Sequence, residues 1–342
     1  MDSTNNVDPR AICDRYTDDI YAKMRDDGER TSAYARAIAA AAPGKVCLDV
    51  GTGALALLAL LAAKAGAKHV YAVEANAEAA EAARATVAAA GFADKITILD
   101  GYSTDVQLPE PVDLLLHEIF GEVAGAEGVV HAITDAARRH MRPLSNSEPT
   151  QHASVPALAR SLLCPAEFPS PEYFAALPHP MIASPGATSF KLPNLPLAEL
   201  YLSDKAKAFE VLDFTRLNPS SQHEVELRFV AKRDGTLRGL AIHIEIEMGA
   251  QPPPPQQQNG NDKKNVVWTP TEVDVSSARE GSHWPNVFLM LPEPYEIVAG
   301  QTVRVLARAA LGSEKPKYSF EVALEESGGA VSRELGKVGY PD

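Results

Sequence analysis

Between residues 45 and 158, short apolar runs of strand length alternate with alanine-rich stretches of helix length. A strand that is covered on both faces is apolar throughout, and alanine has the highest helix propensity. The pattern predicts strands over 46–50, 69–73, 96–99 and 112–117, and helices over 54–66, 77–90 and 122–140. Strands and helices in alternation are typical of an α/β fold built on a parallel sheet.

The first 42 residues carry a helical pattern that is broken once. Residues 1–10 predict a loose tail, and the pattern from 11 to 42 is interrupted near Asp26 and Gly28. Ser32 is a candidate N-cap for the helix after the break, because its hydroxyl can accept a hydrogen bond from an amide of the first turn. Pro43 and Gly44 end that helix. We expect a separate N-terminal helical segment over 1–42.

Beyond Pro156 prolines become frequent and the helical periodicity fades. Strand-type runs occur at 225–231, 240–248, 286–291, 301–309 and 318–324. In 240–248 apolar and polar residues alternate, which predicts a half-buried antiparallel strand. We expect a β-barrel or β-sandwich over 156–342, behind an α/β domain over 43–155. Residues 166–205 indicate an insertion with helical character, and the proline- and glutamine-rich segment 252–264 an exposed mobile loop.

Composition narrows the classes of protein. The 342 residues suffice for two domains, and a net charge of −13 argues against direct binding of nucleic acid. The longest apolar run, 54–63, is too short to cross a bilayer, and the N-terminus lacks a hydrophobic signal segment, so we expect no membrane partner. Three cysteines without metal-type spacing predict no metal site and a reducing compartment, taken here as the cytoplasm with nuclear access left open.

The segment Val46-Cys-Leu-Asp49-Val-Gly51-Thr-Gly53 leads from a predicted strand into a predicted helix. Glycines in such a turn let the backbone bend sharply and approach a ligand where a Cβ would clash. One helix length later Glu74 stands at the end of the next strand, where an acid can accept hydrogen bonds from ribose hydroxyls. The combination predicts a nucleoside-binding βαβ unit. The alternative is a strand–helix corner whose glycines serve packing alone.

Two details favour S-adenosylmethionine over a dinucleotide as the ligand. Asp49 stands two residues before the first glycine, a place that suits the cationic methionyl end and does not suit a pyrophosphate. The turn also carries no basic residue for a phosphate. The dinucleotide alternative stays open because Ala56 occupies the third glycine position of that pattern, which tolerates alanine.

Two glutamates follow the predicted strand 112–117. Glu118 stands at its carboxyl end, where ligands bind in open α/β sheets, and Glu127 follows nine residues later, flanked by Gly125 and Gly128. Two carboxylates on one loop can grip a guanidinium, because carboxylate–guanidinium pairing is bidentate and directional. Solvated acids at a helix start are the alternative, since the helix dipole favours them there. We prefer that alternative for Glu122.

Five motifs in order resemble the protein arginine methyltransferase family, over almost the whole chain from 16 to 324. They are the N-terminal helix segment 21–30, the turn 49–53, the strand end 73–76, the double-glutamate loop 118–127 and the Ser-His-Trp loop 282–284. The resemblance implies a Rossmann-like S-adenosylmethionine-dependent methyltransferase domain followed by a β-barrel. It also implies homodimers and a helical dimerisation arm inserted into the barrel, for which 166–205 is the candidate.

The resemblance also implies roles for single residues. S-adenosylmethionine would lie across the strand ends, with residues 1–42 as a lid, and S-adenosylhomocysteine would be the product. The implied cofactor contacts are Met24, Arg30, Asp49, Gly51, Gly53, Glu74, Ala75, Ser103 and Thr104. The implied catalytic residues are Glu118, Glu127 and His283, and the implied substrate contacts add Tyr21 and Trp284. His283 is expected to pair with Asp27, which would tie the barrel to the N-terminal helix and offer a proton exit.

Within the family the sequences of these motifs are most similar to those of the monomethylating, type III branch. Ser103 and Thr104 stand where many dimethylating members carry an acid. Ser282 replaces the threonine of the family and keeps its hydroxyl, and the aromatic residues before the N-terminal helix are few. The expected product is omega-N-monomethylarginine, and the expected substrates are arginine-rich RNA-binding proteins and histone tails.

Several other functions remain open on the sequence. They are a dimethylating member of the family, a catalytically silent member that scaffolds an active partner, a small-molecule methyltransferase and a dinucleotide oxidoreductase. The intact glycines and glutamates argue against a silent member, and the large β-domain with its paired glutamates argues against a small-molecule enzyme.

Overall fold

The computed structural model describes residues 24, 26–142, 151–170, 172–173, 188–192, 197–216, 222–249, 273–279, 281–325 and 331–340. Several predictions lie outside these residues. They concern the place of Tyr21, the N-terminal segment before residue 24, the loop 252–264, and residues 174–187 and 193–196 of the predicted arm.

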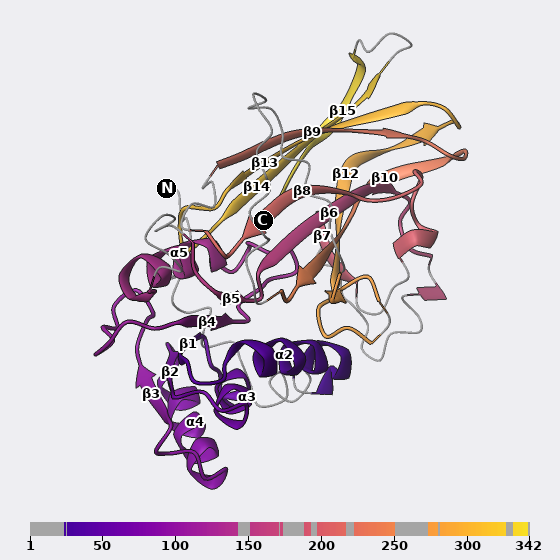
Figure 1. The fold of residues 1–342 in the computed structure, drawn as a ribbon. Helices are drawn as coiled ribbons and strands as arrows, with labels where there is room; N and C mark the ends of the chain where they lie inside the picture. The colour runs from indigo at the N-terminus through magenta and orange to yellow at the C-terminus, as the bar shows by residue number, and fades with distance from the viewer. Residues whose placement is uncertain are drawn as a thin grey trace, which may run out of the picture.

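A parallel sheet with the strand order β3-β2-β1-β4-β5 forms the first domain and confirms the predicted α/β class. Its strands are β1 (Val46–Val50), β2 (His69–Glu74), β3 (Ile96–Asp100), β4 (Leu114–His117) and β5 (Ser154–Val155), and its helices are α2 (Gly28–Ala41), α3 (Leu57–Lys64), α4 (Ala77–Ala89) and α5 (Val129–His140). Figure 1 shows α5 on the side of the antiparallel strands. Strand β1 pairs with β2 on one side and β4 on the other, so the strand order reverses at β1.

The first described helix starts earlier than predicted. Helix α2 begins at Gly28, and Asp27 is its N-cap in place of Ser32. The Asp27 carboxylate accepts a hydrogen bond from the Arg30 amide at 3.1 Å. The predicted break near Gly28 is therefore the start of α2, and Ser32 lies within its second turn.

Two later helices start a few residues after their predicted first residues. Helix α3 begins at Leu57, three residues late, because Ala56 takes a left-handed conformation with φ 44°. Helix α5 begins at Val129 rather than at 122, after Gly128 with φ 82°. The residues from 118 to 128 form a loop, so both glutamates of the predicted pair lie outside any helix.

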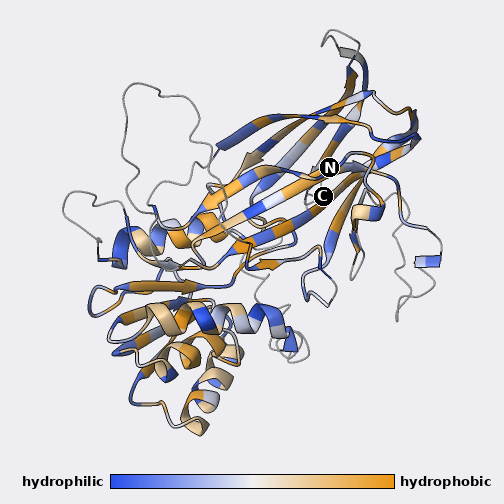
Figure 2. Ribbon diagram, turned by 45° about the vertical axis from the view of Figure 1, so that its right-hand side comes forward, coloured by the Kyte–Doolittle hydropathy of each residue, from blue (hydrophilic) through white to orange (hydrophobic). Residues whose placement is uncertain are grey.

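Two antiparallel sheets form the second domain, as predicted. One has the order β7-β12-β10-β6-β8 with β11 added to β10, and the other has the order β15-β14-β13-β9. The strands are β6 (Leu158–Ala166), β7 (Ser189–Leu192), β8 (Lys207–Asp213), β9 (Gln222–Val230), β10 (Gly235–Glu247), β11 (Val275–Ser276), β12 (Asn286–Ile297), β13 (Thr302–Ala310), β14 (Lys317–Glu325) and β15 (Val331–Tyr340). Apolar and polar residues alternate along the strands of this domain (Figure 2). One face of a strand such as β13 is therefore buried and the other is partly open.

Strand β10 is buried on both faces, which corrects the prediction of a half-buried strand. It lies between β12 and β6, and two of its polar residues have partners in neighbouring segments. His243 shares a hydrogen bond of 3.2 Å with the Tyr201 hydroxyl, and Glu247 forms an ion pair of 2.5 Å with Arg160. The alternation of apolar and polar residues correctly predicted a strand. It did not predict the burial, because polar residues that form hydrogen bonds or ion pairs with their neighbours can be buried as well.

The chain passes from the parallel sheet to the antiparallel sheets between β5 and β6. Between β6 and β8 the structure describes strand β7, paired with β12, and a short 3-10 helix, η2 (Leu197–Glu199). The domain limits and the dimerisation arm stay predictions. Among the described residues, no helix is long and apolar enough to cross a membrane.

Candidate active site

The register of the parallel sheet brings three distant residues to one edge. Val50 at the end of β1 is paired with Val73 of β2 and with His117 of β4. The residues that follow these three positions are Gly51, Glu74 and Glu118. They therefore stand side by side at the carboxyl ends of the strands, where the strand order reverses and where open α/β sheets bind ligands.

The turn after β1 donates its amides inward. The amides of Gly51 and Thr52 donate to the carbonyl oxygen of Val73 at 3.0 Å each, and the Gly53 amide donates to Glu74 Oε2 at 2.8 Å. Gly51 has φ 74°, and a Cβ on it would come within 2.5 Å of Ile119 Cγ2. A turn that uses these three amides internally is poorly suited to cradle a pyrophosphate, which argues against the dinucleotide alternative.

The carboxylate of Glu74 is buried at the pocket wall. The residue is 7% exposed, and besides Gly53 it accepts a hydrogen bond from the Asn76 amide at 2.9 Å. Burial raises the pKa of Glu74, and the hydrogen bonds from the backbone amides counteract part of that rise. Each carboxylate oxygen has a second lone pair, so Glu74 keeps acceptor capacity for the hydroxyls of a ribose.

Asp49 lies beneath the turn rather than in the pocket wall, which corrects the expected contact with a ligand. It is 0% exposed, and its Oδ2 accepts hydrogen bonds from the Thr52 hydroxyl at 2.7 Å and the Ala59 amide at 3.1 Å. Its Oδ1 has no partner among the described residues. Burial raises the pKa of Asp49 to about 7 against the effect of its hydrogen bonds, and Glu74 and Glu118 raise it further.

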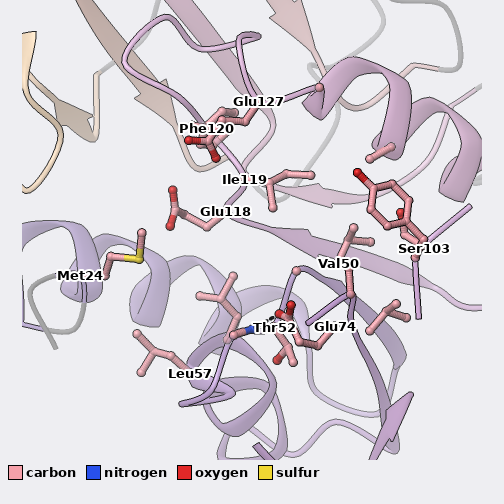
Figure 3. A pocket seen from close by; sticks show the side chains of 18 of the residues that line it. Met24, Val50, Thr52, Leu57, Glu74, Ser103, Glu118, Ile119, Phe120 and Glu127 are labelled. Atoms are coloured by element: carbon pink, nitrogen blue, oxygen red, sulfur yellow. Dashed lines mark hydrogen bonds between the residues drawn. The ribbon is translucent and has the colours of Figure 1, made fainter. Parts of the chain in front are cut away.

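A single pocket contains most of the predicted cofactor and substrate residues. The predicted residues that line it are Met24, Arg30, Gly51, Gly53, Glu74, Ala75, Ser103, Glu118 and Glu127. Figure 3 shows Glu118 and Glu127 above the cavity, Met24 beside Glu118, and Glu74 and Ser103 farther along it. Segments far apart in the sequence thus form one cavity, with Glu118 and Glu127 at one end and Glu74 farther along it.

The guanidinium of Arg30 pairs with Glu118, and both side chains are almost fully buried. Arg30 also donates a hydrogen bond of 3.0 Å to the Met24 carbonyl oxygen. Burial by itself would lower the pKa of Arg30, but the charge of Glu118 outweighs it and raises that pKa. In this structure Glu118 therefore holds a guanidinium, although one from the chain itself. To contact a cofactor carboxylate as predicted, the Arg30 guanidinium would have to bind both that carboxylate and Glu118, or give up its pairing with Glu118.

The third acid of the loop, Glu122, points away from the pocket. It pairs with Lys191 and accepts a hydrogen bond of 2.8 Å from the Tyr340 hydroxyl. Burial alone would raise the pKa of Glu122, but Lys191 and Tyr340 lower it. The interpretation of Glu122 as a solvated acid at a helix start is wrong, because the residue joins the loop to the β-domain.

The predicted pair of Asp27 and His283 is confirmed. His283 Nδ1 lies 3.0 Å from Asp27 Oδ2, the His283 amide donates to the same oxygen at 3.0 Å, and Arg279 pairs with Oδ1. Burial alone would raise the pKa of Asp27, but these partners and the Arg30 amide hold it well below its ordinary value. His283 does not line the pocket. The contact joins the start of α2 to the β-domain.

Trp284 supports the pocket from behind instead of lining it, contrary to the expected substrate contact. It is 4% exposed, and its ring packs against Phe120 at a centroid distance of 6.4 Å. The Arg30 guanidinium lies 5.8 Å from the Trp284 ring, within the range of a cation–π contact. Trp284 thus helps to hold Arg30 in place.

The loop after β3 forms the far end of the pocket and is held by α5. Ser103 lines the cavity, whereas Thr104 does not. Arg139 of α5 donates hydrogen bonds to the carbonyl oxygens of Ser103 at 2.5 Å and Val106 at 2.7 Å, and pairs with Asp135. The far end of the cavity is therefore positioned by the helix that follows the glutamate loop.

Several pocket residues were missed by sequence reasoning. They are Leu55, Leu57, Tyr102, Ile119, Phe120, His131 and Glu314, among others. Tyr102 and Ile119 stand two residues after the ends of β3 and β4, a signal that the carboxyl-end rule could have used. His131 and Glu314 had no such signal, because they arrive from α5 and from the β13–β14 connection. Among the described residues, no group of three or more His, Cys, Asp or Glu side chains could hold a metal.

The chain is similar in sequence to histone-arginine methyltransferases. It is 29% identical over 293 residues to the probable histone-arginine methyltransferase 1.3 of Arabidopsis thaliana, covering 82% of this chain and 51% of that protein. It is 28% identical over 324 residues to the histone-arginine methyltransferase CARMER of Drosophila willistoni, covering 90% and 56%. The chain thus spans about half the length of these relatives. No family model matches it.

Solved structures of protein arginine methyltransferases are similar to this chain in fold. Arabidopsis thaliana protein arginine methyltransferase 10 superposes with a TM-score of 0.71 at 20% identity, covering 94% of this chain and 96% of that one. The PRMT1 enzyme–prozyme heterotetrameric complex of Trypanosoma brucei with AdoHcy gives 0.68 at 20% identity, covering 93% and 97%. With its parallel sheet followed by two antiparallel sheets, the chain has the fold of the protein arginine methyltransferases.

Proposed function

We propose that this chain is a protein arginine methyltransferase. The reaction is transfer of a methyl group from S-adenosylmethionine to a guanidino nitrogen of a protein arginine, with S-adenosylhomocysteine as the other product. The observation that carries the proposal is the pocket in which Glu118 and Glu127 face a cavity that also contains Glu74 and Arg30. The similarity to histone-arginine methyltransferases supports it independently.

The pocket suits S-adenosylmethionine at both ends. Glu74 would accept hydrogen bonds from the ribose hydroxyls, and the buried Arg30 offers a guanidinium to the methionyl carboxylate. Apolar walls from Val50, Leu57 and Leu58 lie between them. The bound cofactor would supply an electrophilic methyl group.

Glu118 and Glu127 would hold the substrate arginine. A guanidinium between two carboxylates is oriented by directional hydrogen bonds, and positioning of this kind supplies much of the rate advantage of an enzyme. The carboxylates would also stabilise the positive charge that stays on the guanidinium through the transfer. Glu118 already pairs with a guanidinium in this structure, that of Arg30.

The proposal is tested by charge-neutral substitutions of the pair. We expect Glu118→Gln and Glu127→Gln to lower turnover of an arginine-rich peptide by about 100-fold or more, by analogy with loss of one preorganised electrostatic partner. Glu81→Gln is the control, because Glu81 is an exposed residue of α4 outside the pocket wall and away from the glutamate loop. It should keep most of the turnover. Both pocket variants within a few-fold of the wild type would refute the proposal.

We further propose that the product is omega-N-monomethylarginine and that the substrates are arginine-rich proteins such as histone tails and RNA-binding proteins. Met24 lines the pocket close to Glu118, which supports a narrow space around the transferred methyl (Figure 3). Mass spectrometry of a fully reacted peptide distinguishes this product from either dimethylarginine. Accumulation of a dimethylated product would remove the monomethyl proposal and leave methyltransferase activity in place.

We also propose a homodimer formed through the arm 166–205, in the cytoplasm. The support is the position of this segment between β6 and β8, where the family resemblance implies an arm. Sedimentation equilibrium of the purified chain tests the dimer, and a monomer at micromolar concentration would exclude it.

A further inference from the structure

A fully buried carboxylate of the β-domain reaches the backbone of the glutamate loop. Glu210 on β8 is 0% exposed, and its Oε2 accepts hydrogen bonds from the Ser161 hydroxyl and from the Gly125 amide at 3.3 Å. Ser161 Oγ in turn accepts a hydrogen bond from the Ala124 amide at 2.9 Å. The Tyr318 hydroxyl donates to Glu210 Oε1 at 2.8 Å.

This cluster contacts the backbone of the glutamate loop between its two pocket acids. Ala124 and Gly125 lie between Glu118 and Glu127 in the chain, and the loop has no regular secondary structure from 118 to 128. Strands β6 and β8 belong to one antiparallel sheet and β14 to the other (Figure 1). Side chains from both sheets therefore converge on two successive amides of the loop that carries the acids.

Gly125 fits this cluster with no space left. A Cβ on Gly125 would lie 2.5 Å from the Tyr318 hydroxyl oxygen and 2.6 Å from Glu210 Oε1. Real Cβ atoms essentially never come so close, so any side chain at 125 would push the loop away from the cluster or break it. The glycine lets the loop backbone approach the carboxylate.

The cluster is costly for stability alone. Burial raises the pKa of Glu210, and the hydrogen bonds from Ser161, Tyr318 and the Gly125 amide counteract part of that rise. A protein with an apolar residue of similar size at such a site is often no less stable than one with a buried charged group there. A hydrogen-bonded carboxylate differs from an apolar residue in that it specifies the place of its donors, here the loop amides.

We propose that Glu210 is a positioning residue for the guanidinium-binding loop, fixing the backbone at Ala124 and Gly125 and thereby the place of Glu127. This inference rests on the proposed function of that loop. Glu210 is on the β-domain and does not line the pocket. It would act on the substrate guanidinium only through the loop.

The inference is tested with two substitutions at the same position. Glu210→Ala removes all acceptors, and we expect it to lower kcat on an arginine peptide by about 10- to 100-fold, in the range known for small misplacements of a catalytic group. The Kd for S-adenosylhomocysteine should stay within about twofold. Glu210→Gln should keep kcat within a few-fold, because its amide oxygen can accept from Ser161 and Gly125 while its NH2 group donates to the Tyr318 oxygen.

The matched control is Glu247→Ala. Glu247 is also buried and paired in the β-domain, but it is outside the pocket wall and not bonded to the loop. This variant should lose stability and keep kcat. An equal loss of kcat in Glu247→Ala, or an unchanged kcat in Glu210→Ala, would overturn the inference.

A second measurement separates this inference from the proposed function. Hydrogen exchange of the amides over 121–128 should accelerate in Glu210→Ala and in Gly125→Ala, while exchange over β1 and β2 stays as in the wild type. If exchange over 121–128 accelerates in these variants but the wild type methylates no arginine peptide, the proposed function fails and the positioning role stands. Unchanged exchange over 121–128 in both variants would reject the positioning role even if methylation is found. Gly125→Ala keeps Glu210 and Ser161 intact, so it serves if Glu210→Ala does not fold.

Discussion

At the scale of single residues, the pocket and the turn beneath it contain buried ionisable side chains. Arg30, Asp49, Glu74 and Glu118 are all buried, and each has a different partner. The pairing of Arg30 with Glu118 was not foreseen from the sequence, which assigned the first to a cofactor and the second to a substrate. Each of the two is buried against a charge of opposite sign, which is how buried ionic groups are usually tolerated.

Asp49 gives a prediction about pH. Its pKa in the folded chain is raised from 3.8 to about 7, so the folded state keeps a proton that the unfolded state loses in that interval. The stability that Asp49 contributes is therefore present below pH 4 and declines as the pH rises towards 7. We expect the wild type to lose, relative to Asp49→Asn, on the order of a few kcal/mol of unfolding free energy between pH 5 and pH 8.

The measurement is urea unfolding of both chains at several pH values. Taking the difference between the two chains removes the contribution of other titrating groups. A difference that stays constant from pH 5 to pH 8 would mean that Asp49 titrates outside this range.

At the scale of secondary-structure elements, α5 connects the two ends of the pocket. Its first residue, Val129, follows Glu127 and Gly128 of the glutamate loop, and its last turn carries Arg139, which holds the loop after β3. The sequence predicted this helix but started it at 122, because the acids of 122 and 127 are also favourable at a helix start. The left-handed Gly128 and the contacts of Glu122 with the β-domain keep that segment out of the helix.

Arg139 gives a prediction for this element. Arg139→Gln removes the guanidinium donors to the Ser103 and Val106 carbonyls, so the loop after β3, which forms the far end of the pocket, should loosen. We expect the KM for S-adenosylmethionine to rise by about tenfold, with kcat at saturation within a few-fold, because the lost contact positions the bound cofactor alone.

The control for Arg139 is Arg142→Gln. Arg142 pairs with Asp113 and donates to the Pro111 carbonyl at 3.2 Å, next to the amino end of β4. Steady-state kinetics of both variants with varied cofactor decides the matter. A rise in KM of the same size in Arg142→Gln would indicate a general loss of stability rather than a local role for Arg139.

At the scale of the whole molecule, the β-domain completes a pocket that begins at the parallel sheet. Glu210, Tyr318 and Lys191 hold the glutamate loop or its neighbours, and His283 with Arg279 holds the start of α2. Glu314 lines the pocket from the β13–β14 connection. The two domains therefore share one site, and changes in the second domain should alter the chemistry of the first.

The tie between Asp27 and His283 gives a prediction at this scale. The pKa of Asp27 is lowered in the folded chain, so its contribution to stability is present above 3.8 and is lost as the pH falls below that value. At pH 7 we expect Asp27→Asn to lower the free energy of unfolding by about 2–4 kcal/mol, because His283 and Arg279 lose a buried charged acceptor.

A double-mutant cycle with His283→Gln measures how much of that loss is shared. Residues in direct contact show coupling energies of about 0.5–3 kcal/mol. Additive losses at pH 7 would show that the contact contributes nothing to holding α2 against the β-domain. At pH 3 the loss in Asp27→Asn should be smaller than at pH 7.

The sequence by itself determined most of the elements and the strand ends that carry the pocket acids, because both depend on neighbours along the chain. Strand runs, the Gly51–Gly53 turn, Glu74 at a strand end and the order of five motifs are all local signals, and β1 was predicted to the residue. For most of the buried acids, only the tertiary structure decided the partner. Arg30 with Glu118, Glu122 with Tyr340, and Glu210 with Gly125 are each separated by more than 80 residues in the chain. Their pairing depends on burial and on the register of sheets that no local pattern encodes.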